Sequence, residues 1–300
     1  MKFGVMLPHR WVYASKESIV EFAKLAEELG FTSIWVTDHI IVPADRTERG
    51  HIFYEPLITL ACVGVQTSLD LGTCVLMLPA RNPILLAKQA ATLDLLSQGR
   101  LILGVGAGWI REEIEAMGSS FKLRGRMEDE AIELLKTLWS KKGPINFNGM
   151  FWKFENMIFE PKPSRKIPIW VGGKKKPSII RAAKLGNGWI PWAISPEELE
   201  NGVRLIEKIS RKKIEVAIVT PVNMVRGSPN TYGGSLGERH WFLAGSTEEV
   251  LRGVERLVEA GCDYLICSFR DVRLFRDDDT SVMVKQAKAF SRGIMPSFTS

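Results

Sequence analysis

The residues with the clearest capacity for chemistry are Asp38 and His39, which follow an apolar run at 32–37. Near neutral pH a histidine exchanges a proton or donates a hydrogen bond to a ring nitrogen or a substrate oxygen. Neighbouring residues on a strand point to opposite sides, so at most one of the two faces inward. The alternative is a structural aspartate that accepts loop N–H groups beside an exposed histidine. The connection at 38–56 is unusually long, which favours a functional loop.

A glycine-rich segment follows another apolar run. The sequence LILGVGAG at 101–108 places Gly106, Ala107 and Gly108 just past a buried strand. Residues without bulky side chains let a flat ring lie against the backbone, and simple packing space is the alternative. The spacing is a weak match to the dinucleotide-binding fingerprint, which needs its third glycine three residues after the second and a helix directly behind it.

A third segment has the features of a phosphate site. Gly172 and Gly173 end a strand and precede three lysines at 174–176 and a helix. Free N–H groups, a helix N-terminus and positive charge attract phosphate, although a lysine run is more often a solvated surface. Trp192 follows a short strand at 188–191 and is a candidate for stacking on a ring. A place in the core or at the rim is the alternative for this tryptophan.

An alternation of strand and helix patterns through the whole chain must position these segments. Eight such units close a barrel whose strands all end at one rim, where catalytic groups gather. The expected fold class is α/β, a (β/α)8 TIM barrel with long βα loops. A segment at 143–162 carries two strand patterns about Asn148-Gly149, which predicts an inserted β-hairpin. The predicted barrel strands cover 3–7, 32–37, 71–78, 100–106, 167–172, 188–191, 214–225 and 262–269.

Composition limits the remaining possibilities. The 300 residues are 45% hydrophobic and 25% charged, and we expect one domain over 1–300 with a frayed tail at about 292–300. No segment reaches the ~18 apolar residues of a membrane span, and no signal-like stretch is present, so we expect a cytoplasmic protein. The four cysteines form no CxxC or Cys/His cluster, which argues against a metal site. The net charge of +6 favours an acidic ligand. The sequence has no long basic stripe of the kind that would indicate nucleic-acid binding.

Several stretches resemble the luciferase-like family of flavin- and deazaflavin-dependent oxidoreductases. They are LGFTSIWVTDH (29–39), LGTCVLMLPARNPILLAKQAATLDLLSQGRLILGVGAGW (71–109), FKLRGRMEDE (121–130) and IPIWVGG to RAAKLGNGW (167–189). They occur in the family's order, and the second is highly specific. The resemblance implies a TIM barrel with insertions and a reduced isoalloxazine-type ring at its C-terminal mouth. By the family's habit, it also implies a homodimer.

Within the family, the resemblance favours the branch that uses coenzyme F420. In that branch a bulge in the third strand carries a non-proline cis peptide bond against the back of the ring. The family's motifs match this chain as follows: the bulge at Cys74-Val75, the Asp-His pair at Asp38-His39 and the phosphate-binding Gly-Gly at Gly172-Gly173.

Two positions depart from the F420-dependent alcohol and sugar-phosphate dehydrogenases. Those enzymes carry an acidic residue where Trp109 stands and a tryptophan where Pro43 stands. These departures put the alcohol-oxidising proton relay of those enzymes in question for this chain.

We therefore expect an oxidoreductase that transfers a hydride between coenzyme F420 and a small organic substrate, with His39 as its catalytic residue. The alternatives are an FMNH2-dependent monooxygenase of the same family and a non-catalytic flavin-binding barrel. The expected cofactor contacts are Asp38, His39, Cys74, Val75, Gly106, Ala107, Gly108, Gly172, Gly173 and Trp192.

Overall fold

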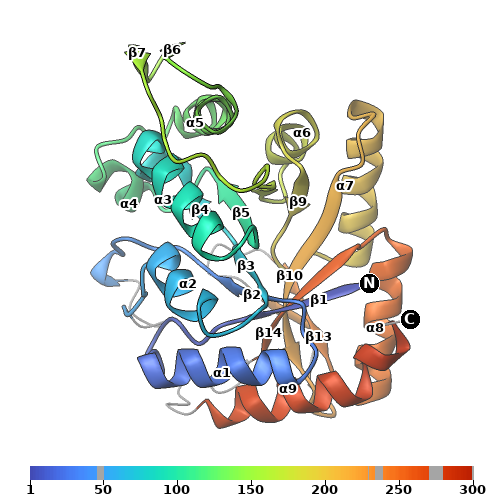
Figure 1. The fold of residues 1–300 in the computed structure, drawn as a ribbon. Coiled ribbons are helices and arrows are strands. Elements are labelled where there is room, and N and C mark those ends of the chain that lie inside the picture. Colours follow the sequence, from blue (N-terminus) through green and yellow to red (C-terminus); the bar gives the residue numbers. More distant parts are fainter. Residues whose placement is uncertain (46–50, 229, 234–238, 270–279, 299–300) are drawn as a thin grey trace.

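The computed structural model describes residues 1–45, 51–228, 230–233, 239–269 and 280–298. Its centre is a closed barrel of eight parallel strands (Figure 1). Each strand pairs with its neighbours in chain order, and the pairing of the seventh strand with the eighth and of the eighth with the first closes the ring. The predicted TIM barrel is confirmed. Its strands are β1 (Lys2–Met6), β2 (Ser33–Val36), β3 (Asp70–Thr73), β5 (Leu101–Gly106), β8 (Ile169–Gly172), β9 (Gly188–Ile190), β10 (Glu215–Asn223) and β14 (Tyr264–Phe269).

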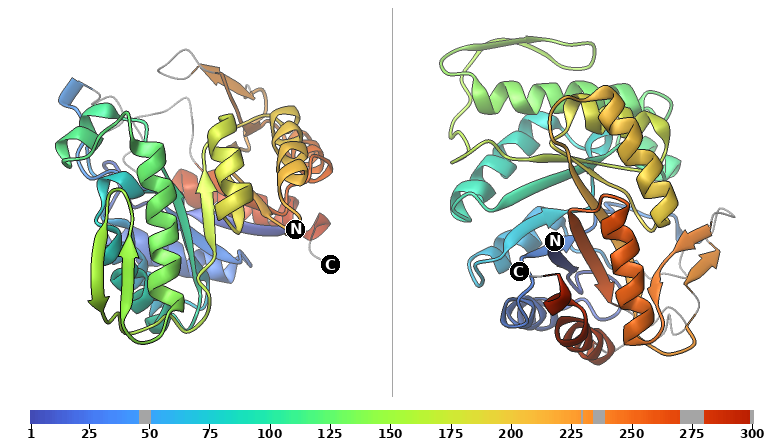
Figure 2. Two further views of the ribbon diagram at one scale, coloured as in Figure 1. Left: turned by 90° about the horizontal axis from the view of Figure 1, so that it is seen from above. Right: turned by 90° about the vertical axis from the view of Figure 1, so that its right-hand side faces the viewer.

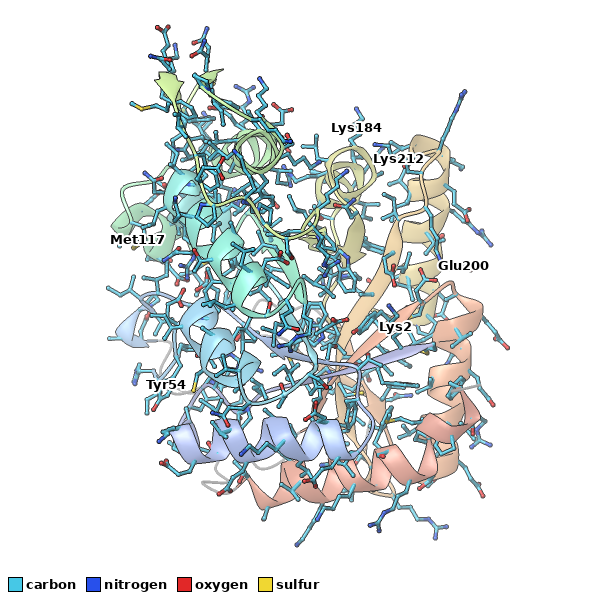
Figure 3. All side chains as sticks on the ribbon, viewed as in Figure 1. Lys2, Tyr54, Met117, Lys184, Glu200 and Lys212 are labelled. Carbon is cyan, nitrogen blue, oxygen red and sulfur yellow. The ribbon has the colours of Figure 1, made fainter. Side chains whose placement is uncertain are left out.

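Helices follow the strands and cover the outside of the barrel. Their apolar faces pack on the strands, whereas charged side chains of the helices, such as Lys184 and Glu200, project into solvent (Figure 3). Three of the helices begin at capping boxes formed by Ser15, Ser195 and Ser246, which satisfy N–H groups of the first turn. The helices are α1 (Lys16–Glu28), α2 (Pro56–Gly64), α3 (Pro83–Leu96), α4 (Arg111–Ala116), α5 (Arg124–Ser140), α6 (Lys176–Leu185), α7 (Pro196–Ile209), α8 (Thr247–Glu259) and α9 (Ser281–Gly293).

The interior of the barrel is filled by aromatic side chains. Trp35 stacks on Trp170 with 5.2 Å between ring centroids, and Tyr264 meets both rings edge to face. Inward-facing glycines on neighbouring strands make room for them, since a Cβ on Gly72 would lie 2.2 Å from the Trp35 ring and one on Gly188 2.4 Å from the Trp170 ring. The barrel is therefore a packed core below its C-terminal mouth.

The third strand is divided. The sequence predicts one strand over 71–78, but β3 ends at Thr73 and pairing resumes only at β4 (Leu76–Met77), before a short 3₁₀ helix, η2 (Leu78–Ala80). Between them the Cys74–Val75 peptide bond is cis, at the position that the family resemblance implies. This bulge brings two side chains to the top of the barrel core.

Two hairpins lie outside the barrel. The first joins β6 (Ile145–Asn148) to β7 (Lys153–Met157), inside the segment where the sequence predicts it, and lies alongside α5 (Figure 2). Glu130 of α5 holds its turn by accepting three backbone N–H groups. The second, which the sequence pattern does not predict, joins β11 (Thr231–Gly233) to β12 (Arg239–Trp241) and leads to β13 (Leu243–Ala244) beside β10.

The C-terminal segment differs from the prediction of a frayed tail. Residues up to 298 are placed: α9 ends at Gly293, a 3₁₀ helix η3 (Met295–Ser297) follows, and Met295 is buried. Phe298 meets the ring of Phe3 edge to face. The prediction was wrong because three apolar side chains, Ile294, Met295 and Phe298, give no periodic signal in so short a segment. Residues 299–300 lie outside the described residues.

Candidate active site at the barrel mouth

The predicted site residues lie around one rim because all eight barrel strands are parallel. The rim positions are Asp38 and His39 after β2, Cys74 and Val75 after β3, Gly106, Ala107 and Gly108 at the end of β5, Gly172 and Gly173 at the end of β8, and Trp192 after β9. The loop after β2 is described except for residues 46–50. Every residue predicted from the sequence thus belongs to the C-terminal mouth of the barrel.

His39 is held by a buried carboxylate. Its Nδ1 atom lies 2.9 Å from Oε2 of Glu113, whose side chain is fully buried on α4. The other carboxylate oxygen of Glu113 accepts the backbone N–H of Ile40 at 2.6 Å. The rings of Phe53 and Trp109 meet the imidazole edge to face, with centroids 4.8 and 6.2 Å away. The imidazole is therefore fixed on three sides, while 17% of its side chain stays exposed.

Asp38 has a structural role in this geometry. Its buried carboxylate receives two hydrogen bonds from the Arg81 guanidinium, at 2.8 and 3.1 Å, and one from the backbone N–H of Met77 at 3.0 Å. A second carboxylate, Glu55, lies 3.1 Å from the same guanidinium. These contacts match the structural alternative stated for Asp38, and they tie β2 to the segment after the bulge.

An apolar floor lies at the top of the barrel core. Cys74, Val75 and Trp192 pack on the interior cluster yet remain partly exposed. The thiol of Cys74 lies 3.2 Å from the sulfur of Met6, and burial raises its pKa to about 12. A thiol with such a pKa is protonated at neutral pH, so Cys74 offers a surface and no nucleophile.

The glycines of the rim differ in what a side chain at each position would contact. A Cβ on Gly106 would lie 2.7 Å from Val75 Cγ2, and one on Gly172 would lie 2.8 Å from Val75 Cγ1. Val75 therefore occupies the space that these two glycines leave. Gly108 has a φ of +77° and lies against Ile114 of α4, while Ala107 beside it is half-buried.

The segment after β8 contains Gly173 and the N-terminus of α6. Gly173 is exposed with a φ of +108°, and its carbonyl accepts the indole N–H of Trp189 at 2.8 Å. No side chain caps α6, which begins two residues after Lys174. An uncapped helix N-terminus beside lysines is the arrangement that phosphate binds.

A second histidine, missed in the sequence, lies at the end of β1. His9 is fully buried, its Nδ1 donates to the carbonyl of Leu7 at 2.9 Å, and its Nε2 accepts the backbone N–H of Thr37 at 2.9 Å. Burial, with the neighbouring Arg10 charge, lowers its pKa to about 3. This neutral ring links the segment after β1 to Thr37, the residue that follows β2.

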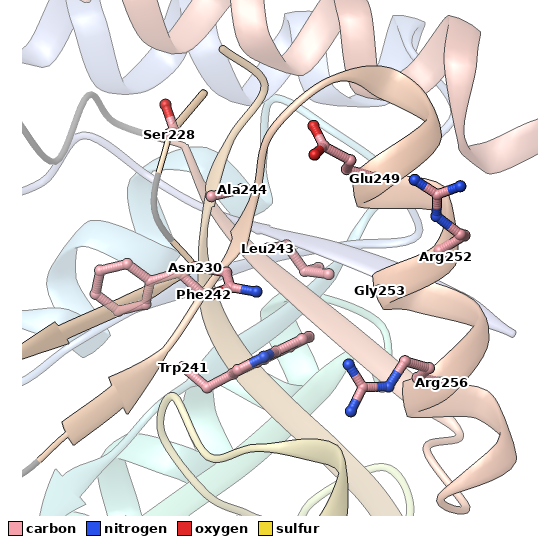
Figure 4. A pocket seen from close by; sticks show the side chains of 10 residues that line it. All are labelled: Ser228, Asn230, Trp241, Phe242, Leu243, Ala244, Glu249, Arg252, Gly253 and Arg256. Carbon is pink, nitrogen blue, oxygen red and sulfur yellow. The ribbon is translucent and has the colours of Figure 1, made fainter. Parts of the chain in front are cut away.

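One pocket formed by the described residues lies elsewhere, beside α8 (Figure 4). Its volume is about 460 Å³, and Arg252, Gly253 and Arg256 of α8 face Trp241 and Leu243 across it. Trp241 and Phe242 both line this pocket, and Phe242 also packs with Ala193 and Trp192. Asp38 and His39, the residues with the clearest capacity for chemistry, do not line this pocket. In the described part of the chain, no three His, Cys, Asp or Glu side chains form a group that could hold a metal ion.

Comparison with known proteins adds to this geometry. Residues 1–229 match the model of the luciferase-like monooxygenase family. The chain belongs to this family. An uncharacterised protein of Mycobacterium tuberculosis is 32% identical over 265 residues, which cover 84% of each chain. An F420-dependent glucose-6-phosphate dehydrogenase of Amycolatopsis mediterranei is 34% identical over 177 residues, 57% of this chain and 52% of the relative.

A solved structure has the same fold over the full length. It is an F420-dependent secondary alcohol dehydrogenase in complex with an F420–acetone adduct, with a TM-score of 0.79, 20% identity, and coverage of 100% of this chain and 99% of the other. None of the helices in the described ranges is long and apolar enough to cross a membrane.

Proposed function

We propose that this luciferase-like barrel is an oxidoreductase that transfers a hydride between coenzyme F420 and a small organic substrate at the C-terminal mouth. The observation that carries the proposal is the pairing of an ordered, partly exposed His39 with buried Glu113 beside an apolar floor. A hydride and a proton must move together in such chemistry, and the mouth offers a surface for a flat ring and a group for the proton.

The residues present fit a cofactor that has a flat ring and a phosphate. Cys74, Val75 and Trp192 would support the ring, and Gly106, Ala107 and Gly108 would border it. Gly173 and the uncapped start of α6 would bind the phosphate, with Gly172 supporting the turn. When bound, the deazaflavin ring of F420 accepts or supplies the hydride. His39 would hold or release the proton at Nε2, while Asp38 keeps the strand ends in register through Arg81.

A binding titration tests the proposal. Purified protein is titrated with F420 and with FMN, each oxidised and reduced, and the four affinities are compared. Tighter binding of F420 is expected. Preference for FMN would favour the second candidate, an FMNH2-dependent monooxygenase, which the name of the matched family supports. Tight F420 binding without turnover on any alcohol, aldehyde or ketone tested would favour a non-catalytic barrel.

We also propose a cytoplasmic homodimer that acts on a small molecule and on neither nucleic acid nor membrane. Helices α2 and α3 lie side by side (Figure 1), and α2 carries no charged residue. Their outer faces expose large apolar side chains, among them Ile58 at 71% and Leu85 at 58%. A helix that is apolar on all sides is normally buried, so a second copy of the chain would cover this face.

A further inference from the structure

We propose that Glu113 is a positioning residue that fixes the tautomer of His39 with its proton on Nδ1, so that a bare Nε2 faces the barrel mouth. This inference deepens the proposed function, because it assigns the atom that would hold the transferred proton. It depends on the geometry of the pair, which does not require any particular cofactor.

The hydrogen-bond chemistry of Glu113 decides the tautomer. An ionised carboxylate only accepts hydrogen bonds, so a 2.9 Å contact with His39 Nδ1 requires a proton on that nitrogen. The backbone N–H of Ile40 donates to the other oxygen at 2.6 Å, and that of Ile41 lies 3.4 Å from it. Backbone N–H groups cannot reverse their direction, so Glu113 must act as an acceptor toward the loop.

The position of Glu113 suits this role. It lies in the first turn of α4, directly after the rim segment of β5, and its side chain is fully buried. Phe53 and Trp109 restrict rotation of the imidazole. A carboxylate that orients a histidine in this way selects its tautomer and stabilises the imidazolium, and loss of the charge costs activity even where the geometry survives.

The isosteric substitution Glu113→Gln gives a sharp test. The oxygen bonded to Ile40 must remain an acceptor, so the new amide would place its oxygen there and turn its NH2 group toward His39. An NH2 group donates, which requires a bare Nδ1 and moves the imidazole proton to Nε2. Glu113→Gln should therefore invert the tautomer of His39 while retaining the contact with the loop.

Nitrogen-15 NMR of the cofactor-free protein reads this directly, at a pH high enough for neutral imidazoles. The chain has four histidines, and the His39 signals are those that disappear in His39→Gln. His9 is an internal reference, since its contacts with Leu7 and Thr37 require the same tautomer. In the wild type, His39 should resemble His9; in Glu113→Gln it should show the opposite pattern, and His9 should not change. The matched control Glu115→Gln, exposed on the same helix, should change neither.

Kinetics with F420 form a separate arm. Glu113→Gln should lower kcat by about 10²–10⁴-fold with little change in cofactor affinity. A wild-type His39 with its proton on Nε2, or a tautomer that Glu113→Gln leaves unchanged, would overturn the inference. An inverted tautomer in a protein that does not bind F420 would retain the inference and reject the proposed function.

Discussion

At the scale of single residues, a substitution of His39 tests the proposed chemistry most directly. His39→Ala should lower turnover by about 10²–10⁴-fold, because it removes the group that would carry the proton. Cofactor affinity should change far less, since the floor of Cys74, Val75 and Trp192 stays in place. Steady-state rates at saturating cofactor measure the effect, with thermal melting as the check on folding. A rate within a few-fold of wild type would make His39 a structural residue.

His9 should make stability depend on pH. Burial lowers its folded-state pKa to about 3 from an ordinary value of 6.5. The unfolded chain therefore binds a proton below pH 6.5 that the folded chain refuses until about pH 3. This contribution to stability is fully present above pH 6.5 and decreases by about 1.4 kcal/mol per pH unit as the pH falls through that window. The conservative variant His9→Gln, which keeps a donor and an acceptor, should lack this slope.

Glu128 affects the pH dependence of stability in the opposite direction and serves as a control for the His9 prediction. Burial on α5, assisted by the nearby Asp129, raises its pKa to about 7, and burial outweighs the Arg181 guanidinium 2.9 Å away. A carboxyl with a raised folded-state pKa destabilises the fold as the pH rises from 4.5 to about 7. Urea unfolding at several pH values should therefore show a steeper loss of stability in acid for Glu128→Gln than for the wild type. Equal pH slopes in wild type and His9→Gln would contradict the assignment to His9.

The candidate site was only partly predictable at this scale. Position at a strand end identified His39, because parallel strands share a rim, whereas the family resemblance alone indicated the bulge residues Cys74 and Val75. Glu113 could not be found in this way, since it lies 74 residues from His39 and the two meet only after the barrel closes. Only the structure shows that Glu113 and Ile114 are buried in the first turn of α4, whereas Glu112 is exposed.

At the scale of elements, β5 and β8 should be coupled to the bulge through Val75. Gly106→Ala should cost roughly 1–3 kcal/mol of stability, because its Cβ would lie 2.7 Å from Val75 Cγ2 and the core must move. Val75→Ala removes that methyl group, so the double variant should regain much of the loss. A double-mutant cycle measured by denaturant unfolding gives the coupling.

Gly104 provides a matched control on the same strand. A Cβ there would lie 1.9 Å from the backbone oxygen of Thr73, and Val75 is only in ordinary contact. Val75→Ala should therefore fail to rescue Gly104→Ala. Rescue of both glycine variants, or of neither, would show that Val75 is not the neighbour that keeps position 106 small.

Elements were predicted where their signal is local. Apolar runs and helical period located all eight strands and the helices that cover them, because each must bury one face. The division of the third strand at Cys74–Val75 has no periodic signature, and only the family resemblance indicated it. The β11–β12 hairpin was missed because its short strands lie in a glycine-rich segment without alternation.

At the scale of the whole molecule, the outer face of α2 and α3 is the proposed interface of the homodimer. In the described chain, Ile58 on α2 and Ile158 after the inserted hairpin are the same residue type with the same exposure, 71%. Ile58 lies on α2, which packs beside α3 with its exposed Leu85, whereas Ile158 lies outside these two helices, next to the exposed Met157. Ile58→Glu places a charge inside the proposed isologous interface and should convert a dimer to monomers, whereas Ile158→Glu should leave the dimer intact.

Sedimentation velocity at micromolar concentration measures both variants, and Leu85→Glu on α3 repeats the test from the neighbouring helix. Because the substituted positions are exposed in the single chain, the variants should fold normally, and thermal melting checks this. A C2 interface contains each substitution twice, so the two new charges would be buried facing an apolar surface and the loss should be large. A monomeric wild type, or a dimer that survives both Ile58→Glu and Leu85→Glu, would contradict the assignment of this face.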